Sequence, residues 1–151
     1  MRLQLVCLIL FSLWGVAGAD DLQGLWALES LHLGDKIIRD PRWKCSLRFE
    51  GDRFRLISTS VTEKRLVGRD GSSTTRPIEH EVFLGGSYQL DKSQLILHVQ
   101  SPVTSEQTDF AQTNFGKAAA DGSYRPGVLV QDQLKLRAVG RELIFVRQNH
   151  K

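Results

Sequence analysis

The sequence predicts an all-β fold, an antiparallel up-and-down barrel of about eight strands with one long insertion. Apolar and polar residues alternate with a period of two along most of the chain, as in strands with one buried and one solvated face. Turn residues recur every 8–12 positions or so, a spacing typical of a sandwich or a barrel. We favour the barrel because its closure removes the exposed edges of such short strands.

Residues 1–19 predict a secretory signal peptide, and residues 20–151 form the predicted barrel domain. Arg2 supplies a positive charge, residues 3–13 are almost entirely apolar, and Ala17-Gly18-Ala19 places small residues before Asp20. The apolar run is too short for a membrane-spanning helix, and no later segment is apolar enough to be transmembrane. We therefore expect a periplasmic or secreted protein.

Cysteine content limits how the mature domain is stabilised. Removal of residues 1–19 takes away Cys7 and leaves Cys45 alone, so no internal disulfide is expected. Stability must then come from packing. Cys45 is expected to be a small buried apolar side chain rather than a reactive thiol.

The clearest hairpin lies in residues 45–58. Apolar side chains occupy alternate positions, the pattern breaks at Gly51-Asp52, and alternation then resumes. Glycine and aspartate tolerate the backbone of a tight turn. One face should carry the apolar set Cys45, Leu47, Phe49, Phe54 and Leu56, with arginines on the other.

The same pattern predicts further strands at residues 26–33, 60–67, 78–90, 94–100, 128–139 and 143–148. Gly85-Gly86 inside the third of these predicts a bulge or sharp bend. The segment 101–127 is too long for a plain loop. Thr108 or Asp109 is expected to cap a short helix that runs to Ala120, which either plugs or flanks the barrel or acts as a ligand-gating lid.

Several short stretches resemble the lipocalin-like domains of small exported bacterial proteins, many of them of unknown function. The opening Leu22-Gln23-Gly24-Leu25-Trp26 resembles their Gly-x-Trp start, and Leu143-Ile144-Phe145-Val146-Arg147 resembles their closing strand. The resemblance implies a lipocalin-like barrel. It also implies that Trp26 seals the closed end while Arg147 packs on the indole, a structural closure rather than a binding site.

The search for catalytic chemistry is negative. The chain lacks a nucleophile elbow, a phosphate loop and a dinucleotide fingerprint, and its four histidines are not spaced as metal pairs. We expect no enzyme activity, no cofactor and no metal site. Nucleic acid is not expected as a partner of an exported domain without an aromatic stacking motif.

Charge is unevenly distributed along the chain. Residues 36–76 contain 11 basic and 5 acidic residues, a local charge of +6, and the rest of the mature chain has 8 and 12, a local charge of −4. A basic face built on Arg48, Arg53, Arg55 and Arg65 could attract an anionic envelope surface. The alternative is a solvated face whose arginines cover apolar strand surface.

Two functions from different classes follow, and a solid structural domain without a ligand is a third possibility. The first is an exported protein that binds a small hydrophobic ligand inside the barrel, through the interior side chains Leu28, Phe49, Phe54, Tyr88, Leu97 and Leu136. Tyr88 would be the polar group that orients the ligand. The second is an interaction or inhibitor module with a solid core, acting through its loops, its basic face or an N-terminal tail at residues 20–23.

Export yields the first testable prediction. Charge, apolar run and small-residue site coincide, so N-terminal sequencing of the exported protein should give a chain that begins at or near Asp20. Recovery of a cytoplasmic protein that still begins at Met1 would contradict it.

Overall fold

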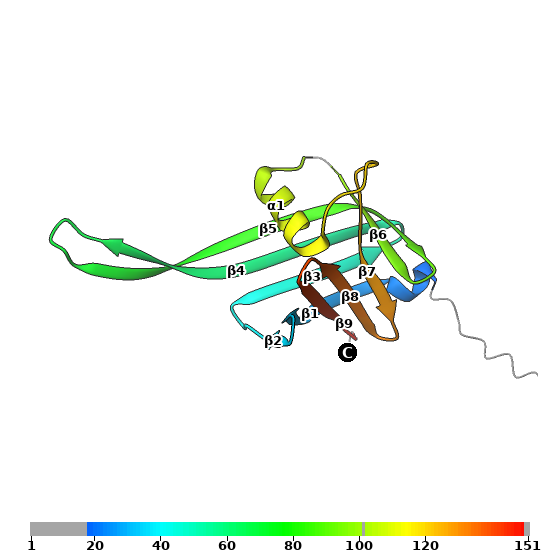
Figure 1. Ribbon diagram of the computed structural model, residues 1–151, viewed down its shortest axis with the longest axis horizontal. Helices are drawn as coiled ribbons and strands as arrows, with labels where there is room; N and C mark the ends of the chain where they lie inside the picture. Colours follow the sequence, from blue (N-terminus) through cyan, green and yellow to red (C-terminus); the bar gives the residue numbers. More distant parts are fainter. Residues whose placement is uncertain (1–17, 101, 150–151) are drawn as a thin grey trace, which may run out of the picture.

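The computed structural model describes residues 18–100 and 102–149. Eight antiparallel strands close into a barrel, with a short ninth strand, β2, added at one edge (Figure 1). The sheet order is β2-β1-β3-β4-β5-β6-β7-β8-β9, and pairing of β1 with β9 closes it. The predicted fold class is confirmed.

The elements follow in chain order. They are η1 (Ala19–Leu22), β1 (Gly24–Leu33), β2 (Lys36–Ile38), β3 (Trp43–Glu50), β4 (Arg53–Val67), β5 (Ser73–Asp91), β6 (Gln94–Val99), α1 (Ser105–Phe115), β7 (Ser123–Val130), β8 (Gln133–Ala138) and β9 (Arg141–Arg147).

The hairpin of β3 and β4 is the one that the alternation predicts. Its register pairs Cys45 with Ser58 and Phe49 with Phe54, and burial alternates residue by residue on both strands. Gly51 takes a φ of +60° in the turn, a backbone region that residues with a side chain rarely adopt. The inner face of this hairpin therefore forms one wall of the core.

The strands predicted to begin at residues 78 and 128 begin earlier, at Ser73 and Ser123, and two predicted strand assignments are wrong. Residues 60–67 are not a separate strand, because β4 runs without a break from Arg53 to Val67 and no turn residue interrupts it. Residues 128–139 are not one strand, because the chain turns between β7 and β8 at Gln131. Gln131 adopts a φ of +54° without being glycine, so the sequence carries no glycine signal for this turn.

Gly86 marks a close approach between strands rather than a bulge. The ladder of β4 and β5 continues in register through Gly85 and Gly86. A Cβ atom on Gly86 would lie 1.9 Å from the carbonyl oxygen of His98, so only glycine lets the two backbones meet there. The predicted bulge is therefore absent from the β4–β5 ladder, and the crowding applies to Gly86 but not to Gly85, where a Cβ would make only ordinary contacts.

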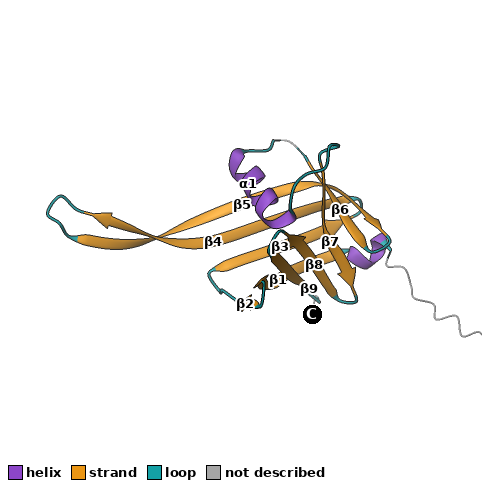
Figure 2. Ribbon diagram, viewed as in Figure 1, coloured by secondary structure: helices purple, strands orange, loops and turns teal. Residues whose placement is uncertain are grey.

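Helix α1 begins and ends earlier than predicted. Thr104, not Thr108 or Asp109, is the N-cap, and its side chain accepts a hydrogen bond from the Gln107 amide. The helix ends at Gly116, whose φ is +86°. It packs on β5, β7, β8 and β9 across one end of the barrel (Figure 2). Of the two predicted roles, this packing is that of a plug.

Aromatic side chains fix the helix over this end. Phe115 meets Phe110 and Tyr124 edge-on, with ring centroids 6.1 and 6.2 Å apart. The Asn114 amide donates to the Phe110 carbonyl oxygen, and its oxygen accepts from Arg141 of β9. The buried polar group is thus satisfied on both sides.

The opposite end of the barrel is closed by Trp26. Its indole is fully buried and donates to the Leu22 carbonyl oxygen over 2.8 Å. The Arg147 guanidinium lies 4.6 Å from the ring centroid and donates to the carbonyl oxygens of Asp21 and Gln23. The predicted contact of Trp26 with Arg147 is confirmed.

Loss of this closure should be expensive. We expect Trp26→Ala to lower the free energy of unfolding by about 3–5 kcal/mol, because a fully buried indole leaves a large cavity and an unpaired carbonyl. Chemical denaturation measures the change. Arg147→Lys keeps the charge but not the guanidinium fork, so it should cost less than Trp26→Ala. A loss below about 1 kcal/mol for Trp26→Ala would show that the indole does not hold the end closed.

Candidate functional site

The interior of the barrel is packed solid around the predicted ligand-binding side chains. Phe49 and Phe54 are 1% exposed, and Leu97 and Leu136 are 0% exposed. Leu97 and Leu136 therefore have no water-sized space beside them, Phe54 borders only a groove on the outside of the barrel, and all four belong to one continuous core cluster. They were expected to line a cavity, and the structure instead uses them as core.

Tyr88 links the N-terminal segment to the β3–β4 turn at the end of the barrel that Trp26 closes. Its hydroxyl donates to the Gly51 carbonyl oxygen over 2.8 Å and accepts from the Gln23 amide over 2.7 Å. The ring packs edge-on against Phe49 at 4.8 Å. Burial raises the pKa of this phenol. Because its donor is already used, Tyr88 does not supply the polar group that was expected to orient a ligand.

The N-terminal segment is also engaged in this closure. Leu22 is fully buried, and the Gln23 side chain both accepts from the Gly51 amide and donates to the Gly51 carbonyl oxygen. An inhibitor tail must be able to leave its own fold. Residues 21–23 are therefore poorly suited to the tail role that the sequence left open.

Leu28 differs from the other predicted interior residues because it reaches an opening in the barrel wall. β1 pairs with β3 over only four positions, from Gly24 opposite Phe49 to Ala27 opposite Ser46. Beyond them, β1 bulges between Leu28 and Ser30 and takes β2 as its neighbour. β1 and β3 therefore separate, and core-facing side chains meet solvent between them.

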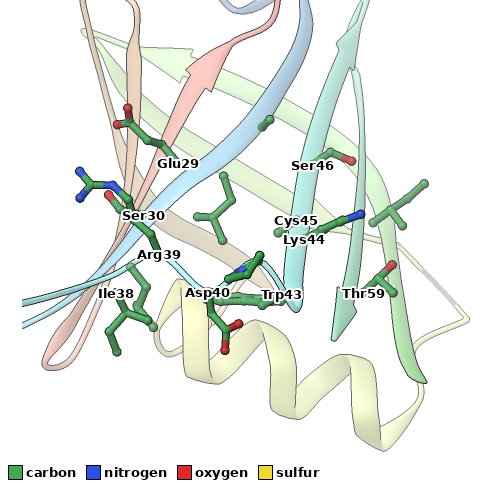
Figure 3. A pocket seen from close by; sticks show the side chains of 15 residues that line it. Glu29, Ser30, Ile38, Arg39, Asp40, Trp43, Lys44, Cys45, Ser46 and Thr59 are labelled. Atoms are coloured by element: carbon green, nitrogen blue, oxygen red, sulfur yellow. The ribbon is translucent and has the colours of Figure 1, made fainter. Parts of the chain in front are cut away.

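This lateral cleft has a volume of about 550 Å³ (Figure 3). In the figure, Glu29 and Ser30 of β1 lie on one side, and Lys44, Cys45 and Ser46 of β3 lie on the other. More than half of the lining residues are apolar, namely Ala27, Leu28, Leu31, Ile38, Pro41, Trp43, Cys45 and Ile57. The remainder, among them Arg39 and Thr59, give the cleft a polar component.

The loop from β2 to β3 forms a braced rim for the cleft. The Asp40 carboxylate accepts from both the amide and the guanidinium of Arg42, and these hydrogen bonds hold the pKa of Asp40 below its usual range. The Trp43 amide donates to the Asp40 carbonyl oxygen, and the Val61 amide of β4 donates to that of Arg42. The rim is thus tied to itself and to the neighbouring hairpin.

Trp43 borders both the cleft and a smaller, open hollow beside α1. Its indole N–H donates to the buried Ser58 hydroxyl over 2.8 Å, which fixes the ring. Trp43 and Leu31 line both spaces. This hollow measures about 280 Å³ and is otherwise lined by Ser58, Ser60, His80, Val82, Phe110, Asn114 and Arg141.

The predicted basic face divides into two separate places. Arg48, Arg53 and Arg55 line one groove of about 440 Å³ on the outside of the barrel. Arg48 pairs with Glu50 at 2.9 Å, and Arg53 donates to Gln100. Arg65 lies ten residues further along β4 than Arg55, opposite Thr75. It lies away from this groove and does not line it.

Some of the residues that line the cleft can be predicted from the sequence, and others cannot. Trp43 lies two residues before Cys45 and so continues the alternating apolar positions Cys45, Leu47 and Phe49. Extending the predicted strand back to residue 43 includes it. Ile38 and Arg39 carry no comparable signal, because β2 spans only three residues. Their position depends on β1 changing partners, which is a tertiary event.

Two further searches of residues 18–100 and 102–149 bear on the site. No group of three or more histidine, cysteine or acidic side chains is placed to hold a metal ion. No helix in this part of the chain has the length and apolar character needed to cross a bilayer.

Comparison with known proteins gives similarities of fold. No model of a protein family matches the chain, and no curated protein sequence matches it. A lipocalin-like protein from Bacteroides uniformis has a similar structure, with a TM-score of 0.46 and 20% identity over 85% of this chain and 99% of that one. An uncharacterized protein from Bacteroides eggerthii gives a TM-score of 0.42 and 13% identity over 85% and 100% of the two chains.

Cys45 lines the cleft and is buried. Burial raises the pKa of its thiol to about 12, although a hydrogen bond with Ser58 acts in the opposite direction. At pH 8 only about one molecule in ten thousand would carry the reactive thiolate. The expectation that Cys45 is buried is confirmed, and its inertness stays a prediction.

Thiol titration with Ellman's reagent at pH 8 tests this inertness. A Cys7→Ser chain, in which Cys45 is the single cysteine, should react slowly when folded and at once in guanidinium chloride. The same chain with Cys45→Ala supplies the background. Rapid modification of the folded protein would contradict the burial-raised pKa.

Proposed function

We propose that the protein binds a small, largely apolar ligand in the lateral cleft between β1 and β3. The opening of the barrel wall carries this proposal, because it exposes core-facing apolar side chains inside a hollow of about 550 Å³. Pockets for small molecules measure about 300–1,000 Å³ and combine apolar walls with a few polar groups. The size and lining of the cleft support this class of ligand.

The charges at the cleft favour a ligand with an acidic end. Arg39 and Lys44 are exposed at its mouth, and neither takes part in the three ion pairs found within the described residues. Of the two acidic residues in the lining, Asp40 is already paired with Arg42. A fatty-acid-like molecule, with its chain in the cleft and its carboxylate at the mouth, suits this arrangement.

Affinity should be moderate. Burial of eight ligand methylene groups contributes about 6 kcal/mol before the costs of association are subtracted. We therefore expect micromolar or weaker binding rather than nanomolar binding.

The same residues support a binding protein rather than an enzyme. Cys45 is the one nucleophilic thiol at the cleft, and its raised pKa leaves it protonated near neutral pH. The proposed site of action is outside the cytoplasm. This part of the proposal rests on the signal-peptide pattern of residues 1–19, most of which lie outside the described residues.

Ile38 and Ile37 provide a matched pair of variants to test binding. Ile38 lines the cleft and is half-buried, whereas its neighbour Ile37 is 53% exposed and lies outside it. We expect Ile38→Trp to fill the cleft and to weaken binding of the fluorescent fatty acid 11-(dansylamino)undecanoic acid by about tenfold or more. Ile37→Trp should bind like the unchanged protein. Fluorescence titration measures both.

Either of two results would contradict the proposal. If the unchanged protein does not bind the probe, or if Ile38→Trp and Ile37→Trp bind it equally, the cleft is not a site for this ligand class. Circular dichroism establishes that both variants are folded.

A further inference from the structure

A two-stranded ribbon projects from the barrel. β4 and β5 pair over fifteen consecutive positions, from Arg53 opposite Ser87 to Val67 opposite Ser73. Only the first part of this ladder belongs to the barrel wall, and the rest extends away from it (Figure 1). We call residues 62–78 the arm. All of its side chains are exposed except that of Ile78, which is half-buried.

The end of the arm is strongly basic. Residues 64–76 contain four basic residues, Lys64, Arg65, Arg69 and Arg76, and one acidic residue, Asp70, which gives a local charge of +3; Glu63 precedes this stretch on the arm. None of these cations belongs to the ion pairs found in the described residues. The Asp70 carboxylate accepts from the Ser72 hydroxyl and amide, which lowers its pKa and commits it to the turn.

One pair on the arm is electrostatically unfavourable in water. Lys64 lies directly opposite Arg76 in the ladder. Like charges directly opposite each other destabilise a sheet. An isolated two-stranded ribbon is also only marginally stable in water. An external anionic partner would relieve the repulsion and support the ribbon.

Apolar side chains stand beside these cations at the tip. Leu66 is 37% exposed and Val67 is 69% exposed, and Val67 belongs to the last pair before the turn at residues 68–72. Side chains alternate between the two faces of a ribbon. Arg65 and Val67 therefore lie on one face, and Lys64, Leu66 and Arg76 lie on the other.

This arrangement distinguishes a lipid surface from a protein partner. Each face of the tip carries both a cation and an aliphatic side chain, so insertion of the tip end-on uses both faces at once. A protein that docked on one face would leave the other unpartnered. Pro77 lacks an N–H group, which obstructs addition of another strand along β5.

We propose that the tip of the arm docks end-on to a bilayer that contains anionic phospholipid. Lys64, Arg65, Arg69 and Arg76 bind the phosphate groups, and Leu66 and Val67 enter the boundary of the acyl chains. Each basic residue near an anionic leaflet contributes about a fivefold increase in partitioning. Binding should therefore weaken as ionic strength rises.

Vesicle sedimentation tests the charge requirement. The full chain should bind vesicles of one part phosphatidylglycerol to three parts phosphatidylcholine, and not vesicles of phosphatidylcholine alone. Lys64→Gln with Arg76→Gln should weaken partitioning about 25-fold. The matched control, Arg53→Gln with Arg55→Gln, removes the same charge from the barrel and should change partitioning by no more than a few-fold.

Tryptophan fluorescence tests which part of the protein enters the bilayer. The emission of Val67→Trp should shift to shorter wavelength on addition of the anionic vesicles. Val139→Trp places the same reporter at a fully exposed position in the turn between β8 and β9, and its emission should not shift. Both changes lie at exposed positions and should leave the fold intact.

Three results would overturn the proposal. The first is that the protein binds neutral vesicles as well as anionic ones, or does not bind anionic ones. The second is that the arm and barrel double variants weaken vesicle binding equally. The third is that the emission of Val139→Trp shifts and that of Val67→Trp does not. A second copy of the chain as occupant would give a dimer without vesicles that Leu66→Gln with Val67→Gln abolishes. That result would also overturn the lipid proposal.

Discussion

The exchange of neighbours along β1 is the constraint on which the rest of the site depends. One edge of β1 is occupied by β9, from Trp26 opposite Arg147 to His32 opposite Glu142. The other edge is shared, because β3 pairs with the first residues of β1 and β2 pairs with its last residues. A barrel closed by full pairing of β1 with β3 would have no lateral cleft. The three residues of β2 therefore both remove a potential exposed edge and open the wall.

The lateral opening between β1 and β3 matters because side chains fill the interior of the barrel. An eight-stranded barrel lies at the size limit where side chains can fill the lumen or leave room for one small molecule. Here Phe49, Phe54 and their neighbours fill it, with Trp26 at one end and α1 at the other. The apolar surface left for a ligand is then at the side, where Leu28 and Trp43 belong at once to the core boundary and to the cleft.

Local patterns predicted the barrel better than they predicted its site. Alternating burial and the Gly51 turn are local properties, so the β3–β4 hairpin followed from sequence. The contact of Trp26 with Arg147 was predicted from the resemblance to lipocalin-like domains, not from a local pattern. The cleft depends on which strand pairs with which, and no local pattern encodes that. The predicted helix boundaries were wrong although the sequence contains the signals. Threonine is a common residue at the N-cap, where Thr104 lies, and glycine is common at the C-terminal end, where Gly116 lies. The turn at Gln131 had no such signal.

The cleft and the arm are physically separable although both use β4. Ile57 and Thr59 line the cleft, and the arm begins three residues later. Between them, the Val61 amide donates to the Arg42 carbonyl oxygen and ties the root of the arm to the rim of the cleft. Substitutions at residues 64–67 alter exposed side chains beyond this tie and leave the backbone ladder intact. The two proposals therefore stand or fall independently: loss of vesicle binding in the tip variants says nothing against the cleft, and loss of probe binding in Ile38→Trp says nothing against the arm.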